Sequence, residues 1–236
     1  MMWFPPALPL RNRLMSKQVD TWKSAFGDAY IARNDATPAL IGEKARVWAQ
    51  MLRPLAGRMP QTILEVGANI GLNLRALSRV TGASLYAVEP NATARARLVD
   101  NAVVPDDHVF DGTAEALPFD DHAFDLVFTS TVLIHVDPNS LLAACREIHR
   151  VSRQYVLCNE YFAAKPEMIE YQGQQNLLFK RDFGTFWMDN FGDLELIDYG
   201  FHWRKVAAMD NTTWWLFRKS NADIATSVDA SPNATT

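Results

Sequence analysis

Short apolar runs alternate with longer amphipathic stretches through most of the chain. The runs that indicate buried strands are TILEV (62–66), LYAV (85–88), HVF (108–110), DLVFT (125–129), YVLCN (155–159), LELIDY (194–199) and TWWLF (213–217). Several contain almost no polar residue, which is typical of parallel strands covered on both faces. Helical patterns fill the gaps between the first five runs. The alternation therefore predicts an α/β fold, with a seven-stranded, mostly parallel sheet and helices on both faces.

Two of the predicted helices have recognisable end signals. NLRALSRVTG is expected to end at Gly82, because glycine commonly terminates a helix. DPNSLLAACREIHRVS is expected to be capped by Asp137, with Pro138 in its first turn. No helical pattern separates the last two strands, so we expect them to form a C-terminal antiparallel hairpin.

Residues 19–219 are expected to form one domain between two dissimilar ends. The N-terminal arm, residues 1–18, is apolar at first but short and interrupted by prolines, so it fits a flexible or docking segment better than a membrane span or an export signal. The tail, residues 220–236, is small and polar and is expected to be disordered. Within 19–55, helical segments at 19–34 and 41–52 are expected to form a lid over the sheet; the alternative is that they only cover one sheet face.

Composition narrows the range of partners. Of 236 residues, 48% are hydrophobic and 21% charged, which fits one globular domain with a full core. The formal net charge is -4 and Lys and Arg are not clustered, which argues against nucleic acid or an anionic membrane as partner. Cys145 and Cys158 are expected to be reduced core residues, not metal ligands or a disulfide. These features predict a cytoplasmic protein without a metal.

The stretch ILEVGANIGLNLRAL (63–77) predicts a strand, a tight turn and a helix. Such a turn binds nucleosides at the carboxyl end of a parallel sheet. The dinucleotide spacing G-x-G-x-x-G fails here, since its second and third positions are Asn69 and Leu72. The spacing acid-x-G-x-G-x-G fits better, with Glu65, Gly67 and Gly71, because asparagine tolerates the left-handed backbone. Glu89, which follows the second strand, is placed to accept hydrogen bonds from ribose hydroxyls. The pattern favours S-adenosylmethionine over a diphosphate cofactor.

Four motifs in order carry a family resemblance: LEVGANIGLN, YAVEPN, GTAEALPF and FDLVFTSTVLIHV. Together they resemble the class I S-adenosylmethionine-dependent methyltransferases. FGDAYIARN, NEYF, EYQGQQNLLFKRDF and LELIDYGF are similar to the methylases associated with pseudaminic acid biosynthesis, from about Trp22 to Lys219. The resemblance implies a Rossmann-like methyltransferase sheet and a sugar-like acceptor of the nonulosonic acid type.

The resemblance also assigns roles around the cofactor. Gly67, Asn69 and Gly71 would form the backbone cradle of the methionine part, Glu65 would orient the turn or take the ammonium through water, and Glu89 would hold the ribose. The adenine edge and the sulfonium side would be lined by Gly112, Thr113, Ala114, Glu115, Thr129 and Ser130. Tyr30, Arg33 and Asn34 resemble lid residues, Arg33 being a partner for the methionine carboxylate; their alternative role is helix packing.

Methyl transfer depends mainly on alignment, which contributes on the order of 7–11 kcal/mol. A general base adds less, so several residues are candidates for it. His135, Glu160 and Tyr161 follow predicted strands at the rim where the acceptor must lie. Each also has a structural alternative: a histidine hydrogen-bonded at a helix start, or a carboxylate with a purely structural role.

Acceptor binding is assigned to the segment 170–183 and to the residues after LELIDY. Tyr171, Lys180 and Arg181 would supply hydrogen bonds and positive charge to a sugar acid. The alternative is a solvated insertion packed by Leu177 and its neighbours. His202 lies after the sixth strand and would join an aromatic wall.

These features favour a methyltransferase acting on an oxygen (or nitrogen) of a small, polar, sugar-like acceptor. Alternatives are a methyltransferase for another small metabolite, such as an amino-acid-derived or antibiotic precursor, and a non-catalytic protein that binds the adenosyl ligand. A dehydrogenase ranks last because of the failed glycine spacing. The sequence does not predict the oligomeric state.

Overall fold

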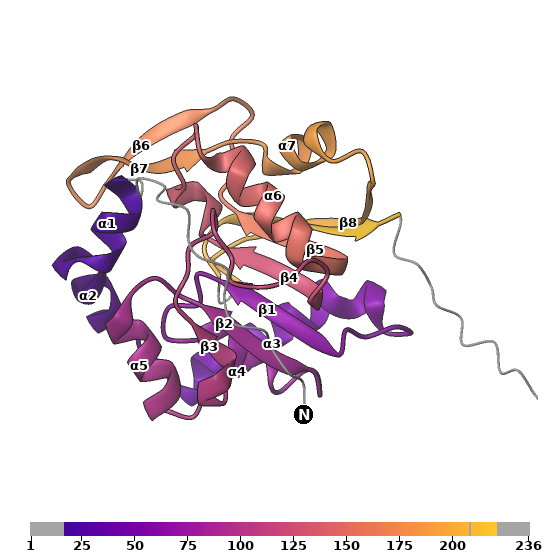
Figure 1. Ribbon diagram of the computed structural model, residues 1–236, viewed down its shortest axis with the longest axis horizontal. Helices are drawn as coiled ribbons and strands as arrows, with labels where there is room; N and C mark the ends of the chain where they lie inside the picture. Colours follow the sequence, from indigo (N-terminus) through magenta and orange to yellow (C-terminus); the bar gives the residue numbers. More distant parts are fainter. Residues whose placement is uncertain (1–16, 208, 221–236) are drawn as a thin grey trace, which may run out of the picture.

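A seven-stranded sheet forms the centre of the computed structural model, which describes residues 17–207 and 209–220 (Figure 1). Its strand order is β3-β2-β1-β4-β5-β9-β8. The strands span β1 (Thr62–Val66), β2 (Ser84–Val88), β3 (Val109–Phe110), β4 (Phe124–Ser130), β5 (Ser152–Glu160), β8 (Leu194–His202) and β9 (Thr212–Lys219). All seven predicted strands are confirmed. The expected antiparallel end is confirmed as well, since β9 runs antiparallel to both β5 and β8.

Strand order reverses between β1 and β4, which creates the crevice where open parallel sheets bind ligands. β2 and β3 extend the sheet on one side of this point, and β4 and β5 extend it on the other. All five strands are parallel, so their carboxyl ends meet along a single edge.

Two helical layers bury the two faces of the sheet. α3 (Pro38–Leu52), α4 (Leu72–Leu77) and α5 (Ala92–Asp100) cover one face, where Trp48, Leu74 and Leu98 share a buried cluster with sheet residues. α6 (Leu141–Val151) and α7 (Phe183–Asn190) cover the other. Short 3-10 turns at η1 (Arg53–Leu55), η2 (Asp106–His108) and η3 (Leu133–His135) join these elements.

The two cysteines lie in the core, as predicted. Cys145 on α6 and Cys158 on β5 are buried in the cluster beneath α6 and α7, and both are free. Burial raises the pKa of each thiol. No helix in the described ranges is long and apolar enough to cross a membrane. The predictions for the arm 1–18 and the tail 220–236 fall almost entirely outside the described residues.

Both helix-end predictions were wrong. α4 ends at Leu77, because the N–H groups of Arg79 and Val80 bond to carbonyls three residues back and tighten the chain into a turn before Gly82. α6 begins at Leu141, with Ser140 at its N-cap position. Asp137 instead makes a separate turn, in which its carboxylate accepts the N–H of Asn139 and its carbonyl accepts the N–H of Ser140.

The expected lid is divided between two positions. α1 (Lys17–Lys23) and α2 (Ala25–Ala32) lie at the carboxyl edge of the sheet, and α2 lies beside α5, where the Arg97 guanidinium donates to the Ile31 carbonyl (Figure 1). α3, by contrast, presents Val47, Trp48 and Met51 to the sheet and covers a face. The first segment therefore has the position expected of a lid, whereas the second covers a sheet face.

A β-hairpin absent from the sequence prediction projects over the same edge. β6 (Glu167–Tyr171) and β7 (Gln174–Lys180) form a separate two-stranded sheet, joined through Gln172 and Gly173, which both have positive φ (52° and 74°). Such a pair closes a tight hairpin. The hairpin reaches the lid, because the Gln18 amide of α1 donates to the carbonyl of Asn176 at 3.3 Å (Figure 1).

Candidate active site

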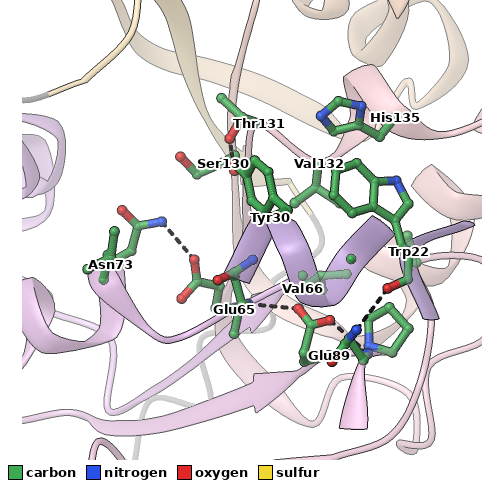
Figure 2. A pocket seen from close by; sticks show the side chains of 18 of the residues that line it. Trp22, Tyr30, Glu65, Val66, Asn73, Glu89, Ser130, Thr131, Val132 and His135 are labelled. Carbon is green, nitrogen blue, oxygen red and sulfur yellow. Dashed lines mark hydrogen bonds between the residues drawn. The ribbon is translucent and has the colours of Figure 1, made fainter. Parts of the chain in front are cut away.

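A cavity of about 520 Å³ lies where β1, β2, β4 and β5 end, under α1 and α2. Residues from the ends of all four strands line it, together with Trp22, Tyr30 and Ile31 of the lid helices. Figure 2 shows Glu65 and Glu89 on the sheet side of this cavity and Trp22 and Tyr30 on the lid side. The predicted crevice is thus a cavity with polar and aromatic walls.

The turn after β1 has the backbone that the sequence pattern requires. Gly67, Asn69 and Gly71 all have positive φ, at 77°, 49° and 76°. The Asn69 side chain compensates for its left-handed backbone, because its Oδ1 accepts the N–H of Ile70 at 2.7 Å and the amide of Asn34 at 3.2 Å. The Asn69 side chain therefore stabilises a backbone conformation that usually needs glycine, and it also contacts Asn34, which follows α2.

The two glycines of the turn differ in what surrounds them. Gly67 lines the cavity, and a Cβ on it would come within 2.6 Å of a Val132 methyl group. Gly71 does not line the cavity, and its absent side chain instead makes room for Leu98 and Val103. Only Gly67 is thus placed for close approach of a ligand, and Gly71 is required by packing.

Glu89 presents a carboxylate to the cavity from the end of β2. One of its oxygens accepts the N–H of Asn69 at 2.7 Å, and the other accepts the N–H of Asn91 at 2.8 Å. Burial raises the pKa of this carboxyl, and the two backbone hydrogen bonds oppose that rise. A carboxylate offers about four lone-pair positions, so each oxygen retains one for a ligand hydroxyl.

Glu65 holds the deepest carboxylate of the cavity. Its Oε1 accepts the Asn73 amide at 2.7 Å, as Figure 2 shows, while its Oε2 is buried without a hydrogen-bond partner among the described residues. Burial raises its pKa to about 8. Lys44 of α3 lies nearby and donates to Asn73 Oδ1 at 3.4 Å. An unpartnered buried carboxylate oxygen is costly, which indicates a position for a donor or a cation.

Segment 112–115 forms the cavity wall beside Glu89, and all four of its residues line the cavity. A bridge between Thr113 and Ala116 folds it back on itself. A Cβ on Gly112 would lie 3.0 Å from a Val88 methyl group and 3.2 Å from Pro118, so glycine allows the wall to pack closely. The segment predicted to contact adenine therefore lines the cavity, and its role toward adenine stays a prediction.

The chain leaves β4 through a strained loop that the sequence did not reveal. Thr131 has φ 57°, which is unusual for a β-branched residue, and its hydroxyl donates to the carbonyl of Ser130. Ser130, Thr131 and Val132 line the cavity (Figure 2). Thr129, predicted to lie beside the sulfonium, is 1% exposed and points into the core instead. Strain of this kind is common where a loop serves a site.

The three lid candidates are split by the structure. Tyr30 and Asn34 line the cavity, but Arg33 does not. The Arg33 guanidinium is exposed and donates to the Ala29 carbonyl and to Gln172 of the hairpin at 2.5 Å. Trp22, which the sequence did not single out, lines the cavity, and its ring meets Tyr30 edge-on with centroids 5.4 Å apart.

His135 lies on η3 at the top of the cavity and packs against Trp22, with ring centroids 4.8 Å apart. Its Nδ1 is 2.5 Å from the carbonyl oxygen of Leu177 in β7. A carbonyl only accepts, so this contact assigns the proton to Nδ1 and leaves Nε2 as an acceptor. Burial lowers the pKa of His135 to about 4, so the ring is neutral near pH 7.

Glu160 and Tyr161 do not reach the main cavity. Glu160 is fully buried, and its carboxylate accepts the N–H groups of Val132, Leu133 and Ile134. Burial raises its pKa to about 7. The Tyr161 hydroxyl donates to Asp210 at 2.7 Å, and burial raises its pKa. Glu160 therefore anchors the loop after β4 instead of lying at the rim.

The predicted acceptor residues are dispersed. Tyr171 lies behind His135, with ring centroids 5.2 Å apart, and does not line the cavity. Lys180 lines a second, outer pocket, whereas the Arg181 guanidinium stacks on Phe186 at 5.0 Å. His202 is buried against Met51, and burial lowers its pKa to about 4. Only Lys180 of these four is placed in a pocket wall.

Several cavity residues had no signal in the sequence. Lys44 lies on a helix predicted only as lid, and Asn159 sits within an apolar strand run. Arg204 and Asp210 come from the connection between β8 and β9, which has the sequence of an ordinary loop, and Thr212 is the first residue of β9. Their positions depend on the antiparallel insertion of β9 beside β5, which brings this loop to the carboxyl edge.

Comparison with known proteins completes the assignment of the fold. Residues 64–157 match the sequence pattern of the family described as "Methyltransferase domain". The chain contains a class I S-adenosylmethionine-dependent methyltransferase domain. No curated protein matches the chain. The matched residues of the methyltransferase run from β1 to β5 and include the turn, Glu89 and the loop after β4.

Solved structures with the same fold have low sequence identity to this chain. The 1,6-didemethyltoxoflavin-N1-methyltransferase of Burkholderia thailandensis, solved with 1,6-didemethyltoxoflavin and S-adenosylhomocysteine, is 15% identical with a TM-score of 0.65, covering 91% of this chain and 95% of that one. The magnesium protoporphyrin IX methyltransferase of Synechocystis, solved with S-adenosylmethionine, is 14% identical with a TM-score of 0.60, covering 89% and 100%. A methyltransferase of Leishmania major is 13% identical with a TM-score of 0.64, covering 87% of each chain.

The residues of the cavity fit S-adenosylmethionine. Each oxygen of the Glu89 carboxylate retains a lone pair that can accept a hydrogen bond from a ribose hydroxyl. Gly67 has no side chain that would block a ligand at the turn. The Glu65 Oε2, which has no partner among the described residues, can accept a hydrogen bond from the ligand ammonium. The cofactor predicted from the turn is thus consistent with both the family and the geometry.

Proposed function

We propose that this methyltransferase transfers a methyl group from S-adenosylmethionine to an oxygen, or a nitrogen, of a small, polar, sugar-like acid. The proposal depends most on Glu89, whose carboxylate faces the cavity with a spare lone pair on each oxygen. Two adjacent hydroxyls of an unphosphorylated ribose match this arrangement. The acceptor class comes from the family resemblance and from the polar residues at the far end of the cavity.

Around the cofactor, we assign Glu65 to the methionine ammonium and segment 112–115 to the adenine edge. Support for the first comes from the buried, unpartnered Glu65 Oε2. Support for the second comes from the cavity wall beside Glu89. Tyr30 and Asn34 would close over the ligand, with Asn34 tied to the turn through Asn69. Arg33 points to the hairpin, so its proposed pairing with the methionine carboxylate has no support from its position.

The chain mainly supplies alignment and exclusion of water. When bound, S-adenosylmethionine would supply a methyl group that its positively charged sulfur activates for transfer to an acceptor atom, and the acceptor's proton would pass to a base or to water. Trp22, Tyr30 and His135 form an aromatic roof over the cavity, which keeps water from the reacting atoms. Ser130 and Thr131 define its floor on the β4 side.

Of the three base candidates, only His135 lines the cavity. Its Nε2 is the free acceptor, and the lowered pKa keeps it neutral. The same low pKa makes it a weak base, so its contribution is expected at the lower end of the usual 10²–10⁴-fold range. We assign Glu160 a positioning role, since it holds the N–H groups that begin η3 and thereby places His135.

A second candidate function is methylation of an aromatic or amino-acid-derived metabolite. Phe162, Phe201 and Trp203 are 47%, 61% and 54% exposed, and the first two line the outer pocket. Exposed rings at the mouth of a site favour a planar or apolar ligand. Two proteins with a similar fold are methyltransferases of 1,6-didemethyltoxoflavin and of magnesium protoporphyrin IX.

The test combines binding with turnover. Purified protein is titrated with S-adenosylhomocysteine and with NAD, and then incubated with methyl-labelled S-adenosylmethionine and a panel of sugar acids, neutral sugars and aromatic acids. We expect S-adenosylhomocysteine to bind and NAD not to bind, with label transferred to a sugar acid. Binding of NAD alone would overturn the cofactor assignment, and label transferred only to aromatic acids would establish the second candidate.

A further inference from the structure

A row of polar side chains crosses three neighbouring strands on the cavity wall beyond Glu65. Ser130 on β4, Asn159 on β5 and Thr212 on β9 all line the cavity. Ser130 and Asn159 are paired in register, and the Asn159 amide donates to the Ser130 hydroxyl at 2.9 Å. These side chains lie on the face covered by α3, where the neighbouring sheet residues are apolar.

Two atoms of this row have no hydrogen-bond partner in the described part of the chain. They are Asn159 Oδ1 and Thr212 Oγ1, and the residues are 0% and 1% exposed. Leaving a buried polar atom without a hydrogen bond costs about 1–3 kcal/mol, so such an atom in a binding site is expected to pair with a ligand. Their position in the cavity wall indicates that a hydroxyl or amide group of a ligand forms the hydrogen bonds that these two atoms lack.

An outer pocket of about 390 Å³ adjoins the cavity. Arg204 and Asp210 line both spaces and so lie at the boundary between them. The outer pocket is also lined by Tyr161 and Lys180 and by the exposed rings of Phe162 and Phe201. A ligand that occupied both spaces would pass Asp210, whose carboxylate is held by the Tyr161 hydroxyl.

The outer pocket carries two cations without anionic partners. Neither Lys180 nor Arg204 forms a salt bridge with any carboxylate that the structure describes. The Lys180 ammonium lies 5.7 Å from the centroid of the Tyr161 ring. Their sequence neighbours are arranged differently: Arg181 stacks on Phe186, and Lys205 is exposed and lines neither pocket. Guanidinium and ammonium groups are the common partners of carboxylate and phosphate.

We propose that the acceptor is an organic oxyanion that spans both spaces. Its hydroxyl or amide groups contact Ser130, Asn159 and Thr212, and its carboxylate or phosphate is bound by Arg204 and Lys180. This inference rests on the proposed function, because it takes the main cavity to hold the reacting end. The proposal assigns the principal contact with the anion to Arg204, and not to Arg181 or Tyr171, which the sequence favoured.

The experiment is a calorimetric titration of the full chain, with and without S-adenosylhomocysteine. The probes are N-acetylneuraminic acid for a carboxylate, glucose 6-phosphate for a phosphate, and N-acetylmannosamine as a neutral sugar. We expect one of the two anions to bind at least about tenfold more tightly than the neutral sugar. Arg204→Gln should weaken that binding by about tenfold or more, and Lys180→Gln by less.

Two matched variants serve as controls. Lys205→Gln and Arg181→Gln remove a neighbouring positive charge each and should change the anion affinity by less than about twofold, because Lys205 is exposed and Arg181 stacks on Phe186, and neither lines a pocket. The proposal is overturned if neither anion binds, if the neutral sugar binds as tightly, or if the controls weaken binding as much as Arg204→Gln. Anion binding that depends on Arg204 in a protein that fails to bind S-adenosylhomocysteine would overturn the proposed function and leave the anion site standing.

Discussion

Two buried glutamates at the same edge of the sheet differ in what they serve. Glu89 directly follows β2, and Glu160 is the last residue of β5. Both are almost inaccessible to solvent, at 7% and 0% exposure, and both accept backbone N–H groups. Glu89 takes one N–H on each oxygen and faces the cavity, whereas Glu160 takes three N–H groups of a single loop and lies beneath it.

The difference separates the cofactor side of the site from the acceptor side. On the cofactor side, short turns present their polar groups directly to the cavity. On the acceptor side, the buried acid holds the strained loop after Thr131, and the cavity is lined by residues from the chain segments around it. A carboxylate at a strand end is therefore a binding group or a loop anchor, depending on how many backbone donors reach it.

Replacing Glu89 should have the largest effect on ligand binding. Glu89→Gln loses a charged acceptor for two ribose hydroxyls, and hydrogen bonds to charged groups contribute about 1.5–3 kcal/mol each. Together they amount to about 4 kcal/mol, or roughly a 1,000-fold loss of affinity for S-adenosylhomocysteine. Isothermal titration measures it directly.

Glu160→Gln is the matched control, since it makes the same change at the other buried acid. Its affinity for S-adenosylhomocysteine should stay within about threefold of the original protein, because the side chain does not line the cavity. Equal losses in the two variants would remove the distinction between binding group and loop anchor.

Glu160 should instead be visible in the pH dependence of stability. Burial raises its pKa from 4.5 to about 7, so the folded protein binds this proton more tightly than the unfolded chain. The contribution is fully present below about pH 4.5 and is lost as the pH rises through about 7. A shift of this size corresponds to roughly 3 kcal/mol.

Glu160→Gln resembles the protonated acid, so this variant should not lose stability as the pH rises through about 7. Urea unfolding of both proteins at about pH 5 and about pH 8 gives the difference in the free energy of unfolding, and other buried acids cancel in the comparison. If the variant retains the full slope of the original protein, another group causes it and the interior position of Glu160 is wrong.

The fold was largely predictable because its strands are buried on both faces. Runs such as TILEV and DLVFT have no exposed face to interrupt them, so their apolar character marks them in the sequence. The hairpin β6–β7 escaped prediction for the opposite reason. Glu167, Met168 and Glu170 are exposed on it, so β6 shows no clear alternation of apolar and polar residues.

The lining of the cavity was predicted best around the turn after β1 and at Glu89. Gly67, Asn69 and Glu89 act through local backbone geometry, which the sequence spacing fixes. Asn159, Arg204 and Thr212 come together through the antiparallel insertion of β9, a long-range pairing that no local pattern encodes. Lys180 ends a hairpin that was not predicted and Arg181 follows it, so the sequence could not show that only Lys180 lines a pocket.

Glu65 is a third buried acid, and it can be distinguished from Glu89 by the proton that the protein releases when the ligand binds. Burial raises the pKa of Glu65 to about 8, and its free Oε2 would meet the ligand ammonium. A nearby cation favours the ionised form, so binding near pH 7 should release a proton. The affinity for S-adenosylhomocysteine should then rise by up to about tenfold per pH unit below about pH 8 and level off above it.

Titrations in buffers of different ionisation enthalpy measure the released proton. 5′-Methylthioadenosine lacks the amino-acid part and should bind without this release, which separates Glu65 from Glu89. Glu65→Gln should abolish the pH dependence for S-adenosylhomocysteine. Equal proton release with both ligands would instead assign the effect to the ribose side.

The smallest expected effect concerns Asn69, where the family pattern has glycine. Asn69→Gly keeps the left-handed backbone but loses the side-chain bonds to Ile70 and Asn34, so the protein should lose about 1 kcal/mol of stability. Its backbone N–H still reaches Glu89, so affinity for S-adenosylhomocysteine should change by less than about threefold. Asn69→Ala keeps neither the cap nor an easy left-handed backbone and should cost roughly 1–2 kcal/mol more. If the glycine variant bound the ligand much more weakly while remaining folded, the contact from Asn69 to the lid would be part of ligand binding, and the cofactor side would depend on the lid as much as on the turn.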